Sequence, residues 1–269
     1  MINYARICML GAALATASAQ AKVVCTVIAD AGTGSVLMEQ GDCRTRVTPA
    51  STFKVALSVM GYDAGFLEDD HSPVLQYKKG DVDWGGENWR QPTDPARWLE
   101  YSVVWYSQRI THAIGAQRLQ QYVRDFGYGN ADVSGDAGQD NGLDRSWIGS
   151  SLKISPVEQV AFLRKLVRRE LPASANAFDM TSRIVMTHDL PNGWRVHGKT
   201  GSGTPKPPER NAGHAVGWFV GWMTNGDRTL VFARLTRDEK PMPGTAGVRA
   251  REAFLKEAPA LLGGLVPRT

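Results

Sequence analysis

Residues 215–235 read AVGWFVGWMTNGDRTLVFARL, two apolar runs separated by four residues typical of turns. The pair Asn225-Gly226 is the strongest short-range signal for a hairpin, because these residues accept the positive φ angles of a tight two-residue turn. The stretch therefore predicts two antiparallel strands, over residues 215–223 and 228–235.

Strand-like segments also occur elsewhere towards both ends of the chain. Residues 194–200 precede the hairpin and form a third candidate strand. Near the other end, residues 22–29 and 35–39 are strand-like and flank a turn that contains two glycines. These segments predict one antiparallel sheet assembled from the two ends of the chain.

Helical patterns fill the middle of the chain and follow the last strand. Apolar residues recur at helical spacing, or a clear N-cap is present, over 51–60, 102–126, 155–170, 176–187 and 245–262. We therefore expect an α/β fold in which the sheet carries an inserted all-helical lobe. The sheet lobe is expected at about 22–60 and 181–269, and the helical lobe at about 61–180.

Composition narrows the class of protein. The 269 residues are 42% hydrophobic and 22% charged, which is typical of a globular domain. The 31 Lys and Arg residues are scattered and nearly balanced by 27 Asp and Glu, so a nucleic-acid partner is not expected. The five histidines show no metal-binding spacing, so no metal site is expected.

The first residues have the pattern of a signal peptide. Arg6 precedes an apolar stretch at 7–17, and Ala19-Gln20-Ala21 matches an A-x-A cleavage site. We expect residues 1–21 to be removed and 22–269 to act in the periplasm. No other stretch is apolar enough to cross a bilayer, so no stable membrane association is expected.

Cysteine usage agrees with an exported protein. Cys8 would leave with the signal, and Cys25 and Cys43 would remain on either side of the N-terminal turn. In an oxidising compartment these two residues could form a disulfide. Two buried, reduced thiols are the alternative at this stage.

Ser51-Thr52-Phe53-Lys54 is an S-x-x-K motif at the start of a predicted helix. Residues three apart share a helix face, so the Lys54 amine can reach the Ser51 hydroxyl and remove its proton. About half a match is expected by chance in a chain of this composition. A second match, Ser150-Ser151-Leu152-Lys153, falls at a junction between loop and helix, and we interpret it as accidental.

Further motifs follow in a fixed order. They are Ser102-Val103-Val104, Tyr128-Gly129-Asn130 and Lys199-Thr200-Gly201. The last of these is expected only about 0.06 times by chance. S-x-x-K together with K-T-G marks serine enzymes that recognise penicillin.

The sequence resembles a class D (oxacillinase-type) serine β-lactamase over nearly the whole predicted mature chain. The resemblance implies that the expected α/β fold is of the β-lactamase/transpeptidase-like type. Class A relatives have S-D-N, and transpeptidases usually have S-x-N, where this chain has Ser102-Val103-Val104. The matching segments are 49–54, 101–104, 126–130, 147–155, 197–201 and 217–222.

The resemblance implies catalytic roles. Ser51 is the nucleophile that forms an acyl-enzyme, and Lys54 is the general base after carboxylation by CO₂. The Trp147 indole donates a hydrogen bond to the carboxylated lysine. Ser102 passes a proton to the departing nitrogen, and Lys199 holds a positive charge beside it. Apart from CO₂ or bicarbonate, no cofactor is implied.

The resemblance also implies a small-molecule partner, a β-lactam. An arginine after the last strand should bind its carboxylate, for which Arg249 fits best and Arg251 is the competitor. Ser202 stands where the family often has an aromatic residue, although its backbone N–H can still serve the oxyanion hole with that of Ser51. The expected substrate-binding residues are Val104, Thr200, Gly201, Ser202 and Arg249.

The resulting hypothesis is a hydrolase that opens the ring of penicillin-type antibiotics and confers resistance, acting as a monomer or homodimer. Two alternatives share the acyl-enzyme. One is a penicillin-binding transpeptidase or carboxypeptidase, and the other is a non-hydrolytic β-lactam sensor domain.

Overall fold

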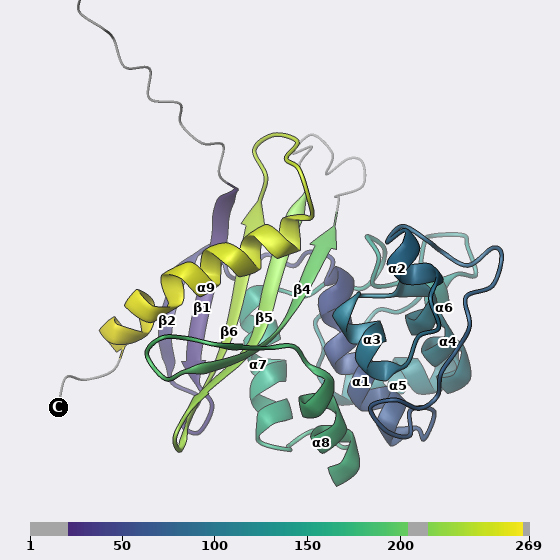
Figure 1. The fold of residues 1–269 in the computed structure, drawn as a ribbon, viewed down its shortest axis with the longest axis horizontal. Helices are drawn as coiled ribbons and strands as arrows, with labels where there is room; N and C mark the ends of the chain where they lie inside the picture. The colour runs from purple at the N-terminus through teal and green to yellow at the C-terminus, as the bar shows by residue number, and fades with distance from the viewer. Residues whose placement is uncertain (1–20, 204–214, 266–269) are drawn as a thin grey trace, which may run out of the picture.

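The computed structural model describes residues 21–203 and 215–265. Its six strands form one antiparallel sheet in the order β2-β1-β6-β5-β4-β3 (Figure 1). The strands are β1 (Lys22–Asp30), β2 (Val36–Gly41), β3 (Thr187–Asp189), β4 (Arg195–Gly203), β5 (Val216–Asn225) and β6 (Arg228–Arg237). The helices are η1 (Ala50–Thr52), α1 (Phe53–Asp63), α2 (Glu87–Arg90), α3 (Pro95–Glu100), α4 (Val104–Ile114), α5 (Ala116–Asp125), α6 (Gly142–Arg145), α7 (Pro156–Val167), α8 (Ala175–Ile184) and α9 (Ala246–Leu265).

The β5–β6 hairpin is the centre of the sheet. Val216 pairs with Arg237 at its open end and Asn225 pairs with Arg228 at the turn. Gly226 has φ +54°, as a tight turn requires. The predicted α/β fold with an antiparallel sheet from both chain ends is confirmed, and each strand of this hairpin is slightly longer than expected.

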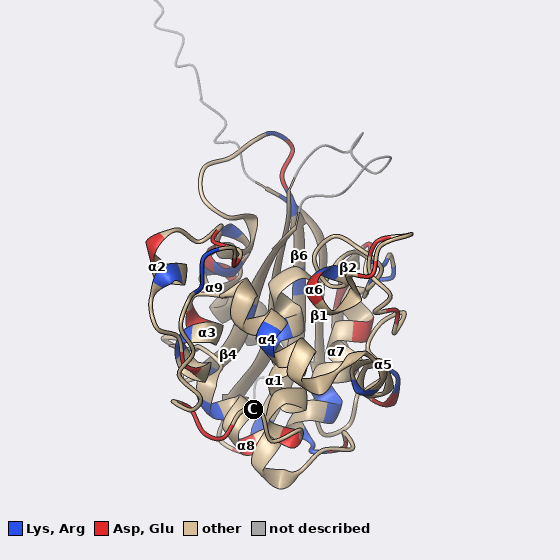
Figure 2. Ribbon diagram, turned by 90° about the vertical axis from the view of Figure 1, so that its right-hand side faces the viewer, with Lys and Arg blue, Asp and Glu red and all other residues tan. Residues whose placement is uncertain are grey.

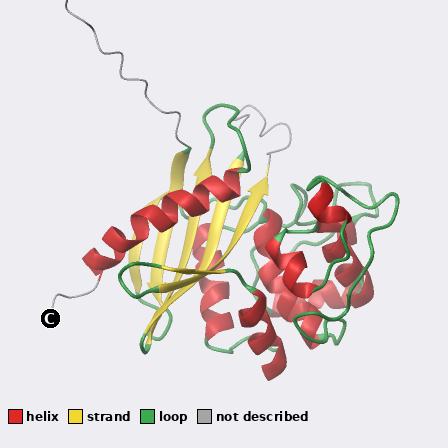
Figure 3. Cartoon of the chain, viewed as in Figure 1, coloured by secondary structure: helices red, strands yellow, loops and turns green. Residues whose placement is uncertain are grey.

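Helices cover both faces of the sheet (Figure 3). On one face α9 packs through Phe254, whose ring lies 4.4 Å from that of Phe232 and 5.7 Å from that of Phe219. The opposite face shares a continuous apolar core with α1, α7 and the remaining helices. Because both faces are covered, β5 is buried from Val216 to Met223.

The helical part differs from expectation in three respects. The single helix expected over 102–126 is two helices, because Gly115, with φ +80° and ψ 155°, separates α4 from α5. The short edge strand β3 was not predicted. Finally, α7 packs against β1 and β6, so the segment 61–180 is not a wholly separate helical lobe.

The chain ends and surface bear on the export hypothesis. The predicted signal peptide lies outside the described residues except for Ala21. Within residues 21–203 and 215–265, no helix has the length and apolar character needed to cross a membrane. Lys and Arg are interspersed with Asp and Glu over the elements in view in Figure 2.

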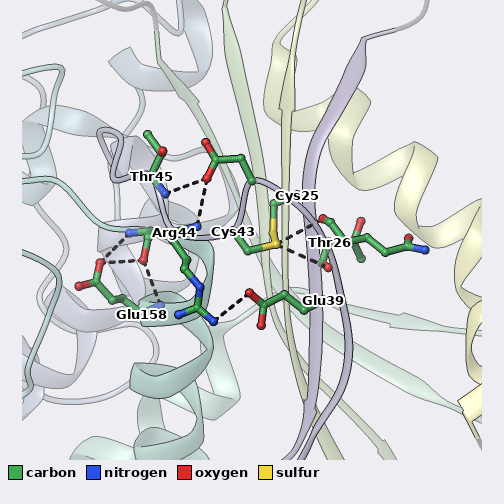
Figure 4. Close-up of a disulfide and its surroundings, with 10 residues drawn as sticks. Cys25, Thr26, Glu39, Cys43, Arg44, Thr45 and Glu158 are labelled. Atoms are coloured by element: carbon green, nitrogen blue, oxygen red, sulfur yellow. Dashed lines mark hydrogen bonds and ion pairs between the residues drawn. A yellow bond between two sulfur atoms is a disulfide. The ribbon is translucent and has the colours of Figure 1, made fainter.

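A disulfide joins Cys25 of β1 to Cys43, which follows β2, with Cα atoms 5.1 Å apart (Figure 4). Gly41 ends β2 with φ +86°, and a Cβ there would lie 2.1 Å from the Val24 carbonyl oxygen. Only glycine permits this close turn, which directs the chain back over β1.

We predict that the free energy of unfolding of the Cys25→Ser/Cys43→Ser double variant is lower than that of the wild type by about 2–4 kcal/mol, because the bridge restricts the unfolded chain. Turnover by the folded fraction should be retained, since the bridge lies outside the catalytic cleft. Denaturant unfolding measures the loss. Alkylation of both cysteines in the unreduced, exported protein would contradict the bridge.

Candidate active site

The first S-x-x-K motif forms one helical turn. Ala50, with φ +48°, starts the short helix η1, and α1 continues directly from it. The Lys54 side chain is fully buried, and its Nζ lies 3.5 Å from the Ser51 hydroxyl oxygen. The spacing therefore places the amine at the nucleophile, as the sequence predicted.

The second motif has no such geometry. Residues 150–153 form no helix, and the Ser150 hydroxyl donates a hydrogen bond to the Asp136 carboxylate. Its interpretation as an accidental match agrees with this structure.

Ser102 and Lys199 meet from the two lobes. Ser102 has φ +56° and lies just before α4, while Lys199 projects from β4 and is 2% exposed. The Lys199 ammonium donates hydrogen bonds to the Ser102 hydroxyl and, at 3.2 Å, to the Thr200 carbonyl. A strained serine fixed by a buried lysine is suited to transferring a proton.

Burial controls the protonation of both lysines. It lowers the pKa of Lys54 well below its usual value, and the nearby charge of Lys199 lowers it further. Burial also lowers the pKa of Lys199 to about 7, with a smaller contribution from the positive charge of Arg251. A buried Lys54 is therefore readily held as a neutral amine, the form able to accept a proton.

Glycines allow three backbone segments to meet behind the nucleophile. A Cβ on Gly201 would lie 2.9 Å from the Pro49 carbonyl oxygen, so β4 can lie against the η1 turn only with glycine here. On the other side of β4, a Cβ on Gly247 of α9 would lie 2.5 Å from the Gly201 carbonyl oxygen. The last residue of the K-T-G motif is therefore a packing requirement.

The Y-G-N loop supports the nucleophile turn from behind. Tyr128 is fully buried, and its ring centroid lies 5.3 Å from that of Phe53. The Gln159 amide donates hydrogen bonds to the hydroxyl groups of Thr52 (2.9 Å) and Tyr128 (3.4 Å). Tyr128 is thus a packing residue rather than part of the cleft.

A cleft of about 400 Å³ opens above Ser51 between the two lobes. Its wall from the helical side consists of Trp84, Gly85, Trp89, Glu100, Tyr101, Ser102, Val104, Trp147 and Ile148. Its wall from the sheet side consists of Met186, Thr200, Gly201, Ser202, Thr245, Val248 and Arg251. Lys54 and Lys199 are buried beneath this surface.

Trp147 separates the cleft from the apolar core. The residue is 1% exposed, its ring lies 5.6 Å from that of Phe53, and its carbonyl accepts a hydrogen bond from Thr48. Its indole N–H donates to none of the described residues. A donor that lines the cleft and has no partner among the described residues is suited to binding a further acceptor.

The two candidate arginines differ in where the structure places them. Arg249 does not line the cleft, because its guanidinium donates to the buried Asp238 carboxylate and to the Pro243 carbonyl. Arg251, the competitor, lines the cleft and lowers the pKa of Lys199. The two arginines are two residues apart on α9 and therefore lie on different sides of the helix, which gives them different surroundings.

Other cleft residues have roles that the motifs did not indicate. The Ser202 hydroxyl accepts a hydrogen bond of 2.8 Å from the Gly247 N–H in the first turn of α9. Trp84 and Glu100 also line the cleft but were not predicted as site residues. Glu100 lies two residues before Ser102, and this closeness to a motif is the one sequence signal for it.

The fold and site define the class of penicillin-recognising serine proteins. Residues 24–259 match the family model "Penicillin binding protein transpeptidase domain". The β-lactamase OXA-9 of Klebsiella pneumoniae is 44% identical over 89% of this chain and 88% of its own. The β-lactamase OXA-1 of Escherichia coli is 39% identical over 79% of this chain and 75% of its own.

The solved structure of the class D β-lactamase OXA-427 gives a TM-score of 0.84 at 45% identity, covering 90% of this chain and 99% of that one. The chain belongs to the class D β-lactamase family. The resemblance drawn from the motifs is thereby confirmed.

Proposed function

We propose that the protein hydrolyses the β-lactam ring of penicillin-type antibiotics through a serine acyl-enzyme and so confers resistance. The observation that carries this proposal is the convergence of Ser51, Lys54, Ser102 and Lys199 at one cleft between the lobes. The similar β-lactamases support the same reaction.

In the first half-reaction, the Ser51 hydroxyl oxygen attacks the lactam carbonyl carbon while the Lys54 side chain accepts its proton. The backbone N–H groups of Ser51 and Ser202 are the expected donors to the developing oxyanion. As the ring C–N bond breaks, Ser102 gives a proton to the nitrogen, and Lys199 stabilises the charge that develops on Ser102. The proton that Lys54 accepted then restores the Ser102 hydroxyl, so Lys54 can act as a base again.

In the second half-reaction, a water molecule attacks the ester carbonyl and the Lys54 side chain accepts the water's proton. The tetrahedral intermediate collapses, and the proton returns to Ser51 as its oxygen departs. The opened product then leaves with two carboxylates.

The surroundings of Lys54 fit carboxylation by CO₂. A neutral amine is required for that addition, and burial favours it. Trp147 supplies an indole N–H without a described protein partner, and Lys199 supplies a nearby cation. When present, the carbamate is a stronger proton acceptor at this position than water and carries a negative charge that complements Lys199.

Val104 favours a hydrolase over a transpeptidase. This residue is 5% exposed and lines the cleft, at the position where transpeptidases usually carry asparagine. The apolar side chain offers no hydrogen-bonding group at that place in the cleft. Steady turnover of a chromogenic cephalosporin is the expected result, whereas a stoichiometric burst without recovery would indicate a sensor.

We also propose that residues 1–21 direct export to the periplasm. The sequence pattern at Arg6 and Ala19-Gln20-Ala21 supports this, as does the disulfide.

We predict that Arg251→Ala raises KM for penicillins by about tenfold, because it removes a charged donor from the cleft. It should also raise the pKa of Lys199, since a nearby positive charge is lost.

Arg249→Ala is the matched control: KM should change little, while stability falls by about 3 kcal/mol because Asp238 loses its partner. Steady-state kinetics and thermal unfolding measure the two effects, and the reverse pattern would return the substrate role to Arg249.

A further inference from the structure

The two walls of the cleft carry opposite charges. Arg251 lies on the sheet side and Glu100 on the helical side. Glu100 is the exposed last residue of α3, and its carboxylate has no hydrogen bond or ion pair to any described residue. A negative charge at a helix C-terminus is unfavourable, so an acidic residue at this position does not stabilise α3.

The arginines of α2 and α3 bind other groups instead of Glu100. Arg97 stacks over the Tyr101 ring at 4.3 Å and donates to the Asn88 carbonyl. Arg90 forms an ion pair with Asp83. Glu100 therefore keeps its charge available to a molecule in the cleft.

An exposed indole extends the same wall. Trp84 is 62% exposed, whereas Trp89 is 7% exposed, with ring centroids 6.2 Å apart. Trp89 is fixed because its indole N–H donates to the Tyr101 carbonyl and its ring packs on Gly85, where a Cβ would lie 2.0 Å from Nε1. Trp84 thus offers a large apolar face beside a rigid neighbour, and an indole face also attracts cations.

We propose that this wall selects β-lactams whose acylamino side chain carries both an aryl ring and an ammonium group. The ammonium pairs with Glu100, and the ring packs on Trp84. A penicillin is a rigid bicycle with its carboxylate at one end and its acylamino group at the other. With the carboxylate at Arg251, the side chain extends towards the opposite wall. This inference rests on the proposed β-lactam hydrolysis.

Ampicillin and benzylpenicillin test the inference, because they differ only in the α-ammonium group. The assay is run with bicarbonate at about pH 6.5, below the usual pKa of an α-amino group. In Glu100→Gln, the ratio of kcat/KM for ampicillin to that for benzylpenicillin should fall about fivefold to tenfold. The change should appear mainly in KM. Trp84→Ala should lower kcat/KM for both penicillins.

Glu68→Gln is the matched control, since Glu68 is exposed, carries the same charge and does not line the cleft. An equal fall of the ratio in this variant, or an unchanged ratio in Glu100→Gln, overturns the inference. Binding to Ser51→Ala supplies a readout without turnover: ampicillin should raise its unfolding temperature more than benzylpenicillin does, and Glu100→Gln should remove that difference. Failure of hydrolysis with this binding difference intact would overturn the proposed reaction but not the ammonium site.

Discussion

Replacement of Ser51 by alanine is expected to abolish β-lactam turnover, with a loss of at least about 10⁴-fold in kcat. The methyl group cannot attack the lactam carbonyl, so no acyl-enzyme forms. The fold should persist, because the Ser51 side chain makes one long hydrogen bond, to Lys54 at 3.5 Å, among the described residues. Hydrolysis of a chromogenic cephalosporin and the thermal unfolding temperature together measure both expectations.

Ser150→Ala is the control for this variant, because Ser150 belongs to the other S-x-x-K match and bonds Asp136. It should retain turnover. Mass spectrometry after mixing with substrate adds a direct readout: an acyl adduct should appear transiently in Ser150→Ala and be absent in Ser51→Ala. Loss of activity in Ser150→Ala with near-normal rates in Ser51→Ala would show that the wrong motif was chosen.

The second large effect concerns CO₂ and Lys54. Removal of CO₂ at mildly acidic pH should reduce turnover, and bicarbonate should restore it. Carboxylation needs the neutral amine, and the lowered pKa of Lys54 favours that form. As the pH falls through this lowered pKa, the amine becomes protonated and carboxylation is lost. Activity should therefore rise with pH on the acidic side and depend most on bicarbonate there.

Trp147→Phe sharpens this test, because it keeps an aromatic ring but removes the indole N–H. Loss of a charge-assisted hydrogen bond of about 1.5–3 kcal/mol should raise the bicarbonate requirement about 10- to 100-fold. Trp98→Phe is the control, since that buried indole donates to Ser107 instead. If neither wild type nor Trp147→Phe responds to bicarbonate, and ¹³CO₂ gives no carbamate signal, Lys54 acts as an amine.

Short sequence motifs predicted the structure correctly where it depends on residues that are close together in the chain. Asn225-Gly226 fixed the position of the central hairpin because its turn geometry is decided by two residues. Ser51 and Lys54 could be paired for the same reason, since one helical turn determines their approach. The K-T-G motif was informative because it rarely occurs by chance. Its last residue, Gly201, is required by close backbone packing.

Features that depend on tertiary contacts were harder to predict from the sequence. Gly115 looked compatible with a continuous helix, yet the chain turns there with φ +80°. Arg249 lies outside the cleft because it pairs with Asp238, a residue just after β6 that spacing does not reveal. The cleft position of Glu100 likewise depends on how α3 faces a sheet formed much later in the chain.

The position of β1 within the sheet has a consequence for the order of folding. Lys22 pairs with Arg237, so a strand near the start of the described chain is hydrogen-bonded to one near its end. Such distant pairing delays closure of the sheet until almost the entire polypeptide is available, whereas the helices form from local contacts. A chain interrupted before residue 228 would leave the inner edge of β1 unpaired and prone to aggregate. Completion of the active cleft is therefore among the last events of folding.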